Sequence, residues 1–184
     1  MKMPSRSLMS IAVIATLCGA CSSAQMRNSV ASATAIMYNT SGAPIGTAQL
    51  WQDKSGVVYV DIASISLPAG THGIHFHAVG KCDTGTTPAF SSAGGHYNPM
   101  GKAHGLQNPS GPHAGDNPNI DIPASGVGRV AFSTDRVSLT PGTASLFDAD
   151  GTSLVIHAAA DDQVTDPAGN SGARIACGVV RALP

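Results

Sequence analysis

The sequence predicts an all-β domain, an antiparallel sandwich or barrel, and three of its features support that prediction. Charged residues make up only 11% of the 184 residues, whereas glycine (21 residues) and proline (12 residues) are frequent. The apolar runs are short, turn-forming residues separate them, and no sustained helical period is present. About eight such runs in a chain of this length are typical of a single domain built from short strands.

The first residues predict an export signal that is not part of this domain. Lys2 and Arg6 precede an apolar run at residues 8–17, which is too short to form a permanent membrane-spanning helix. We therefore expect residues 1–20 to act as a signal peptide and the protein to leave the cytoplasm.

The end of this signal resembles a bacterial lipobox. Gly19 and Ala20 are small residues directly before Cys21, although Cys18 stands where leucine is usual. On this interpretation the signal is of the lipoprotein type, and Cys21 carries a lipid anchor that attaches the protein to the periplasmic side of the outer membrane. The alternative is an ordinary secretory signal cleaved near Ala24.

The rest of the chain divides into a short tether and one domain. Residues 21–32 are mostly small and polar and predict a flexible tether, which leaves residues 33–184 for the folded domain. Strands are expected where apolar runs lie between turn signals, as in 56–65, where apolar and polar residues alternate. The expected strands are residues 33–38, 46–53, 56–65, 73–80, 126–135, 144–150, 152–158 and 173–180.

A long segment without periodicity interrupts this series at residues 81–118. It is rich in glycine, proline, serine, asparagine and histidine. Structureless segments of this length are uncommon inside compact domains, and they are generally functional or disordered. This segment is therefore a candidate for a functional site.

Two cysteines, Cys82 and Cys177, lie outside the export signal. In an oxidising compartment a structural disulfide is the default state for such a pair. Two free thiols, or two thiolate metal ligands, are the alternative.

Seven histidines are present, and two of them share one predicted strand. His75 and His77 are separated by one residue, so in a strand they project from the same face, roughly 6–7 Å apart. Two imidazoles at that separation can converge on one metal ion. The motif alone is weak, because polar residues on a sheet surface can have the same spacing.

The long loop strengthens the metal interpretation. It contains His96, His104, His113 and Asp116, and His157 ends a later apolar run near two carboxylates. Histidine and aspartate suit a tetrahedral zinc ion, and neutral imidazoles also suit copper. Six histidines and one aspartate are too many for one ion, so we expect two adjacent sites, which a single imidazole could bridge. The alternative is a solvated histidine-rich loop.

Six segments in order resemble the secreted bacterial copper/zinc superoxide dismutases, and the resemblance extends from about residue 33 to the C-terminus. The segments are GIHFHAVG, GGHYNP, KAHG, PHAGD, VIHAAADD and GNSGARIACGVV. The resemblance implies an eight-stranded antiparallel Greek-key barrel or sandwich with long metal-binding and active-site loops. It also implies a copper ion that cycles between oxidation states and a structural zinc ion, which together disproportionate superoxide to dioxygen and hydrogen peroxide.

The resemblance assigns a role to each motif residue. The copper ligands would be His75, His77, His96 and His157, and the zinc ligands would be His96, His104, His113 and Asp116. His96 would bridge the metals and deliver a proton, Arg174 would dock the anion, and Asp161 would accept hydrogen bonds from one histidine of each site. Cys82 and Cys177 would form the intrasubunit disulfide, while His72 would be a structural histidine behind the site.

One departure concerns the charges that steer superoxide to the metal. Residues 158–173, which precede Arg174, contain no lysine, although this loop supplies the steering charges in the eukaryotic branch of the family. Lys81 and Lys102 are our candidates for that role. The family's dimer contacts differ between the bacterial and eukaryotic branches. The resemblance therefore allows a homodimer but does not say which surface would form it.

The competing interpretations place other functions on the same chain. A non-catalytic periplasmic copper- or zinc-binding protein could share the fold, but it would be expected to lack a copper histidine or the arginine. A purely structural lipoprotein would leave the ligand-like residues unexplained. A nucleic-acid partner is not expected, because the formal charge is −1 and no cluster of lysine and arginine is present.

Overall fold

The computed structural model describes residues 28–184. The predicted signal peptide, the lipid-anchoring Cys21 and most of the predicted tether lie outside the described residues. Within residues 28–184, no helix is long and apolar enough to cross a membrane.

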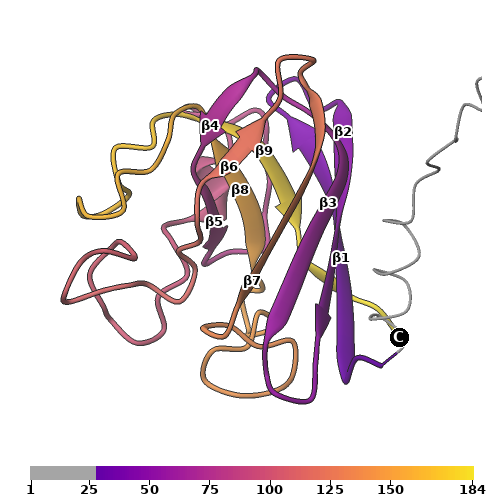
Figure 1. Ribbon diagram of the computed structural model, residues 1–184, viewed down its shortest axis with the longest axis vertical. Coiled ribbons are helices and arrows are strands. Elements are labelled where there is room, and N and C mark those ends of the chain that lie inside the picture. The colour runs from indigo at the N-terminus through magenta and orange to yellow at the C-terminus, as the bar shows by residue number, and fades with distance from the viewer. Residues whose placement is uncertain (1–27) are drawn as a thin grey trace, which may run out of the picture.

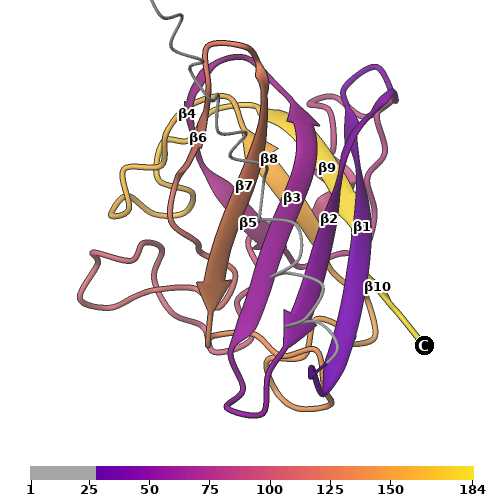
Figure 2. The same ribbon diagram turned by 45° about the vertical axis from the view of Figure 1, so that its right-hand side comes forward.

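Apart from one short 3-10 turn at Ser91–Ala93, the regular secondary structure of the described chain consists of antiparallel strands, which confirms the all-β prediction (Figure 1). Eight strands form one curled sheet in the order β5-β8-β9-β1-β2-β3-β7, with β10 paired to β1, while β4 and β6 form a separate pair. Figure 2 shows the sheet turned so that β1, β2, β3 and β7 come forward. The strands are β1 (Ala31–Asn39), β2 (Pro44–Gln52), β3 (Val58–Ser66), β4 (Gly70–His72), β5 (Ile74–His77), β6 (Ile120–Ile122), β7 (Val127–Thr134), β8 (Ser153–His157), β9 (Arg174–Val179) and β10 (Arg181–Ala182).

Alternation along the strands builds the core. In β1, Ala33, Ala35 and Met37 are buried, whereas Ile36 between them is half exposed. This is the two-residue period expected of a strand with one buried face. The inward side chains of the curled sheet and of β6 form one large apolar cluster.

One strand prediction is wrong, and three short strands were not expected. Residues 144–150 do not form a strand but a series of turns, in which Ser145 makes a single bridge to Ser138. The run is apolar because Leu146 faces the core from a turn, a position that periodicity cannot distinguish from a strand. The short strands β4, β6 and β10 were not expected, because two or three residues are too few for a pattern.

Two long loops project from the same side of the molecule, beside β5 and β8 (Figure 1). The first long loop, residues 78–119, joins β5 to β6, and the second long loop, residues 158–173, joins β8 to β9. The fold therefore brings the histidine-rich segment and the segment before Arg174 to the strands that carry the other histidines.

Candidate metal centre

Strands β5 and β8 place three histidines on one face. His75 and His77 alternate along β5 with their ring centroids 6.4 Å apart, as the spacing predicted. His157 is the last residue of β8, the strand that pairs with β5. All three side chains are buried, so the sheet holds them in fixed positions.

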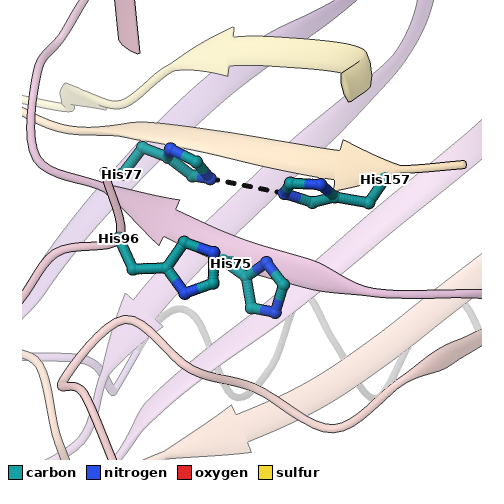
Figure 3. Close-up of side chains that lie close together, drawn as sticks. All are labelled: His75, His77, His96 and His157. Carbon is teal, nitrogen blue, oxygen red and sulfur yellow. Dashed lines mark hydrogen bonds between the residues drawn. The ribbon is translucent and has the colours of Figure 1, made fainter. Parts of the chain in front are cut away.

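His96, from the first long loop, completes a group that we call the imidazole cluster (Figure 3). Its members are His75, His77, His96 and His157, and they offer ligand atoms that all lie within 4.8 Å of one another. The Nε2 atoms of His77 and His157 are 3.4 Å apart. The ring nitrogens His75 Nδ1 and His96 Nε2 are buried and have no hydrogen-bond partner among residues 28–184. Four nitrogens thus converge on one point where an ion would satisfy them.

Hydrogen bonds on the far side of each ring direct a lone pair into this cluster. His77 Nδ1 donates to the Gly94 carbonyl at 2.9 Å, and His157 Nδ1 donates to the Gly172 carbonyl at 3.1 Å. A carbonyl can only accept, so in each neutral ring Nε2 is left as the unprotonated, ligating nitrogen. Such outer contacts fix the tautomer and the orientation of metal-binding histidines.

Burial keeps the imidazole cluster neutral. Desolvation lowers the pKa of His96 to about 4, although the hydrogen bond to Asp116 opposes the shift. Desolvation, reinforced by the electrostatic interaction with His75, lowers the pKa of His157 to about 3. The pKa of His77 is also well below its ordinary value, mainly because of burial. Neutral imidazoles are the form that binds a metal, so these rings are ready to ligate at neutral pH.

The second group, which we call the carboxylate cluster, consists of His96, His104, His113 and Asp116. Three Nδ1 atoms face the single oxygen Asp116 Oδ1, at 2.9 Å for His96, 3.1 Å for His104 and 3.3 Å for His113. A tetrahedral ion with bonds of about 2.0 Å separates its ligand atoms by about 3.3 Å. The four ligand atoms therefore have the chemistry and nearly the spacing of a zinc site.

His104 has the opposite electrostatics from the imidazole cluster. Desolvation would lower its pKa, but hydrogen bonds to the carboxylates of Asp116 and Asp161 outweigh it and raise the pKa to about 9. Without an ion, this buried ring is therefore held as an imidazolium between two carboxylates. A dication in the carboxylate cluster would replace that proton.

Asp161 joins the two clusters from the second long loop. Its Oδ2 is 2.6 Å from His75 Nε2, and its Oδ1 is 3.0 Å from His104 Nε2. Burial would raise the pKa of this carboxyl, but the two histidines hold it well below its usual range. One carboxylate thus orients a ring in each cluster, as the resemblance implied for this residue.

The main chain of Asp161 is fixed by a residue that sequence reasoning missed. Asn119 Nδ2 donates to the Asp161 carbonyl, and the Asp161 N–H donates to Asn119 Oδ1, both at 2.8 Å. Only the position of Asn119, three residues after Asp116, could have drawn attention to it.

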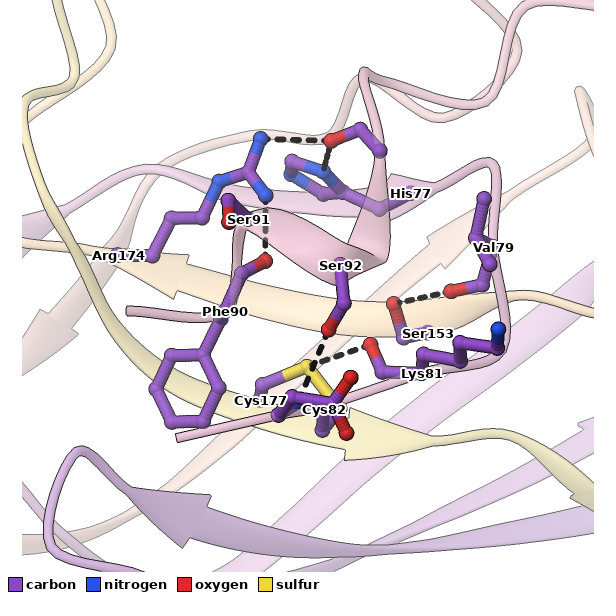
Figure 4. Close-up of a disulfide and its surroundings, with 12 residues drawn as sticks. His77, Val79, Lys81, Cys82, Phe90, Ser91, Ser92, Ser153, Arg174 and Cys177 are labelled. Atoms are coloured by element: carbon purple, nitrogen blue, oxygen red, sulfur yellow. Dashed lines mark hydrogen bonds between the residues drawn. A yellow bond between two sulfur atoms is a disulfide. The ribbon is translucent and has the colours of Figure 1, made fainter. Parts of the chain in front are cut away.

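Arg174 lies next to the imidazole cluster (Figure 4). Its guanidinium donates to the carbonyls of Phe90 and Gly94, each at 2.6 Å. The Gly94 carbonyl also accepts the bond from His77 described above, so one peptide group links the guanidinium to the cluster. Phe90 was not predicted, and it is unusual: a fully buried phenylalanine with a left-handed φ of 59°.

The predicted disulfide is present. Cys82 and Cys177 are bonded, with their Cα atoms 5.6 Å apart, which excludes the alternative of two free thiols or thiolate ligands. Phe90, Ala93 and Val155 pack around Cys177 in a small apolar cluster of their own. The bond therefore ties the first long loop to the strand that begins with Arg174 (Figure 4).

The remaining predicted residues lie outside both clusters. His72 is buried, with Nδ1 2.8 Å from the His157 carbonyl and Nε2 2.9 Å from the Pro68 carbonyl. This places it behind the site, without a ligand role. Lys81 and Lys102 are both exposed on the first long loop.

Comparisons with known proteins agree with this geometry. A sequence model of the family described as copper/zinc superoxide dismutase (SODC) matches residues 45–180. Over 146 residues the chain is 49% identical to superoxide dismutase (Cu-Zn) 1 of Aquifex aeolicus (strain VF5), with 79% of this chain and 85% of that protein covered. Over 153 residues it is 39% identical to the Cu-Zn superoxide dismutase of Caulobacter vibrioides (strain ATCC 19089 / CIP 103742 / CB 15), with 82% and 86% covered.

A solved structure extends the likeness to the fold. A double mutant of a superoxide dismutase-like protein from Bacillus subtilis superposes with a TM-score of 0.74 at 39% sequence identity. The match covers 79% of this chain and 95% of that chain. The similarity therefore extends over most of the fold.

Proposed function

The chain belongs to the copper/zinc superoxide dismutase family, and we propose that its two clusters are the metal centre that disproportionates superoxide to dioxygen and hydrogen peroxide. The imidazole cluster would hold copper and the carboxylate cluster would hold zinc. The observation that carries this assignment is the position of His96, which directs Nε2 into the first cluster and Nδ1 into the second.

The donor sets fit these two ions. Four neutral imidazole nitrogens suit copper, and three imidazoles with one carboxylate suit zinc. When bound, copper supplies the one-electron chemistry that first oxidises and then reduces superoxide, and zinc supplies a structural positive charge. The chain's own residues must orient the ligands, dock the anion and move the protons.

His96 is the residue we assign to proton delivery. His96 would be a ligand in both sites, and its Nε2, which faces the imidazole cluster, is the atom that would hold the proton. A proton held at Nε2 can then pass to the peroxide product, while Nδ1 keeps the ring anchored in the carboxylate cluster. Asp116 Oδ1, 2.9 Å from Nδ1, supports that anchoring.

Arg174 is the residue we assign to anion docking. A guanidinium offers a fork of donors that suits a small anion, and this one is held in place at the edge of the imidazole cluster by two carbonyls. Since two of its donors are already bound, the side chain is pre-oriented before substrate arrives.

The test combines dismutase activity with metal analysis of the same preparation. We expect one copper and one zinc per chain, and we expect replacement of His96 by glutamine to abolish activity. Full copper loading without activity would instead support the alternative, a non-catalytic metal-binding protein on the same fold.

We also propose that the protein is exported and anchored to the outer membrane through Cys21. The positive start, the apolar run and the small residues before Cys21 support this location. Replacement of Cys21 by serine should prevent lipid attachment, detected by mass spectrometry of the mature N-terminus. A mature N-terminus at or near Ala24 in the unaltered protein would indicate an ordinary secretory signal.

Two finer proposals concern the substrate's approach and the assembly. If Lys81 or Lys102 steers superoxide, its replacement by methionine should lower the rate constant at low salt and reduce the rate's dependence on salt. For a homodimer we propose a contact on the outer face of β1, where the apolar side chain of Ile36 is exposed. Sedimentation of the wild type and of Ile36→Lys would test it, with a monomeric wild type contradicting it.

A further inference from the structure

Arg136 is a charged residue close to the carboxylate cluster that no motif singled out. It follows the end of β7, and its side chain is only 26% exposed. Its Nη2 donates a 2.7 Å hydrogen bond to the main-chain carbonyl of Asp116. A residue just after β7 thus reaches the one carboxylate ligand of the proposed zinc site.

The surroundings of Arg136 point to Asp116 as its main partner. Burial of a guanidinium is unfavourable unless hydrogen bonds and opposite charge compensate for it. Asp135 Oδ1 lies 3.9 Å away on a side chain that is 79% exposed, and such exposed pairs contribute little. Arg136 Nε is buried and has no hydrogen-bond partner in the part of the chain that the structure describes. The short bond to Asp116 is therefore what holds this side chain in a mostly buried position.

Each polar group of Asp116 then has a distinct function. Its Oδ2 accepts hydrogen bonds from the main-chain N–H groups of Gly105 at 2.8 Å and His113 at 2.9 Å. Its carbonyl accepts the bond from Arg136. Only Oδ1 is left to face the histidines of the carboxylate cluster. The direction of the ligating oxygen is thus fixed from two sides, by the first long loop and by the segment that follows β7.

We propose that Arg136 is a positioning residue for zinc, holding Asp116 so that Oδ1 points into the carboxylate cluster. The inference rests on the proposed function, since it takes that cluster as the zinc site. The direction in which zinc affinity changes distinguishes this positioning role from simple electrostatics. A positive charge beside a dication repels it, so removal of the charge alone would tighten zinc binding, whereas loss of positioning must weaken it.

The experiment measures zinc and copper affinities separately, by chelator competition on the full protein, for the wild type, Arg136→Met and Arg136→Lys. Arg181→Met is the matched control, because it removes the same charge from an exposed position on β10. We expect Arg136→Met to weaken zinc binding by about tenfold or more, the usual effect of losing an outer contact to a ligand. Copper affinity should not change, and Arg136→Lys, which can still donate to the carbonyl, should recover part of the zinc affinity. The absorption spectrum of cobalt bound in place of zinc should change shape in Arg136→Met only.

The other outcomes are decisive as well. Unchanged or tighter zinc binding in Arg136→Met would overturn the positioning role. Equal weakening of zinc and copper would also overturn it, since that would indicate general loss of structure. A wild-type protein that binds no zinc with this cluster would instead refute the proposed function, and the role of Arg136 with it.

Discussion

Single side chains decide how the two clusters are coupled. Asp161 accepts from His75 of the imidazole cluster and from His104 of the carboxylate cluster, one with each oxygen. An asparagine at this position has one accepting oxygen and one donating nitrogen, so it can serve only one of the two rings. The carboxylate is therefore the smallest group that can orient both.

Replacement of Asp161 by asparagine should weaken binding at one cluster or both by about 10–100-fold. Chelator competition with copper and with zinc would measure it. Asp162→Asn is the matched control. The Asp162 carboxylate neighbours Asp161 in the chain but accepts hydrogen bonds from Val164, Thr165 and Asn170 on the exposed side of the loop. Equal affinities in the two variants would contradict the coupling role.

The backbone conformation of Phe90 leads to a prediction about stability. Its φ of 59° is left-handed and disfavours every residue except glycine, by about 1–2 kcal/mol. Phe90→Gly and Phe90→Ala both delete the buried ring, but only glycine relieves the strain. Phe90→Gly should therefore be more stable than Phe90→Ala by about 1 kcal/mol, measured by urea unfolding.

Phe132, in the middle of strand β7, provides the control for this comparison. In a strand the glycine variant should be the less stable one, by about 0.5–1 kcal/mol. The same order of stability at both positions would mean that Phe90 is not strained.

At the scale of elements, the close packing of the second long loop depends on glycine. Gly169 has a left-handed φ of 60°, and a Cβ built on it would lie 1.7 Å from Asp161 Oδ1 and 2.7 Å from His104 Nε2. Gly172 in the same loop has a φ of 77°, but a Cβ there would meet nothing closer than 3.8 Å. Both positions have a left-handed φ, but only at Gly169 would a Cβ clash with neighbouring atoms.

Gly169→Ala should therefore displace Asp161 and weaken metal binding, whereas Gly172→Ala should only lower stability by about 1 kcal/mol. Thermal unfolding and copper and zinc content of the two purified variants would separate these effects. Full metal content in Gly169→Ala would show that the loop can move away without disturbing the clusters.

The elements also show what the sequence could predict. The alternation in β3 and the spacing of His75 and His77 are local patterns, so they predicted a strand and a shared face correctly. The resemblance placed each cluster residue together with its partners, including Asp161 across 86 positions from His75. Residues 144–150 were misread because a core-facing turn is as apolar as a strand. Phe90, Asn119 and Arg136 were missed because each acts through a main-chain carbonyl or N–H, and such contacts leave no pattern in side-chain type.

For the whole molecule, the buried histidines make the stability of the metal-free protein depend on pH in two directions. Burial lowers the pKa of His96 to about 4 and of His157 to about 3, against about 6.5 in an unfolded chain. At a pH between the folded-state and the unfolded-state pKa values, the unfolded chain binds protons that the folded protein does not. The free energy of unfolding therefore falls as the pH falls below about 6.5. His96 alone would account for about 3 kcal/mol of this loss.

His104 acts in the opposite direction. Burial opposes its protonation, but Asp116 and Asp161 outweigh burial and raise its pKa to about 9. Above about pH 6.5 the folded protein keeps a proton that the unfolded chain has released, so its stabilising effect is lost as the pH rises toward 9. The unfolding temperature of chelator-treated protein should therefore be highest near pH 6.5 and should fall on both sides. Zinc-loaded protein should lack the alkaline decline, because the ion replaces the proton on His104. A metal-free protein whose unfolding temperature rises steadily to pH 9 would show that His104 is not held as an imidazolium between the two carboxylates.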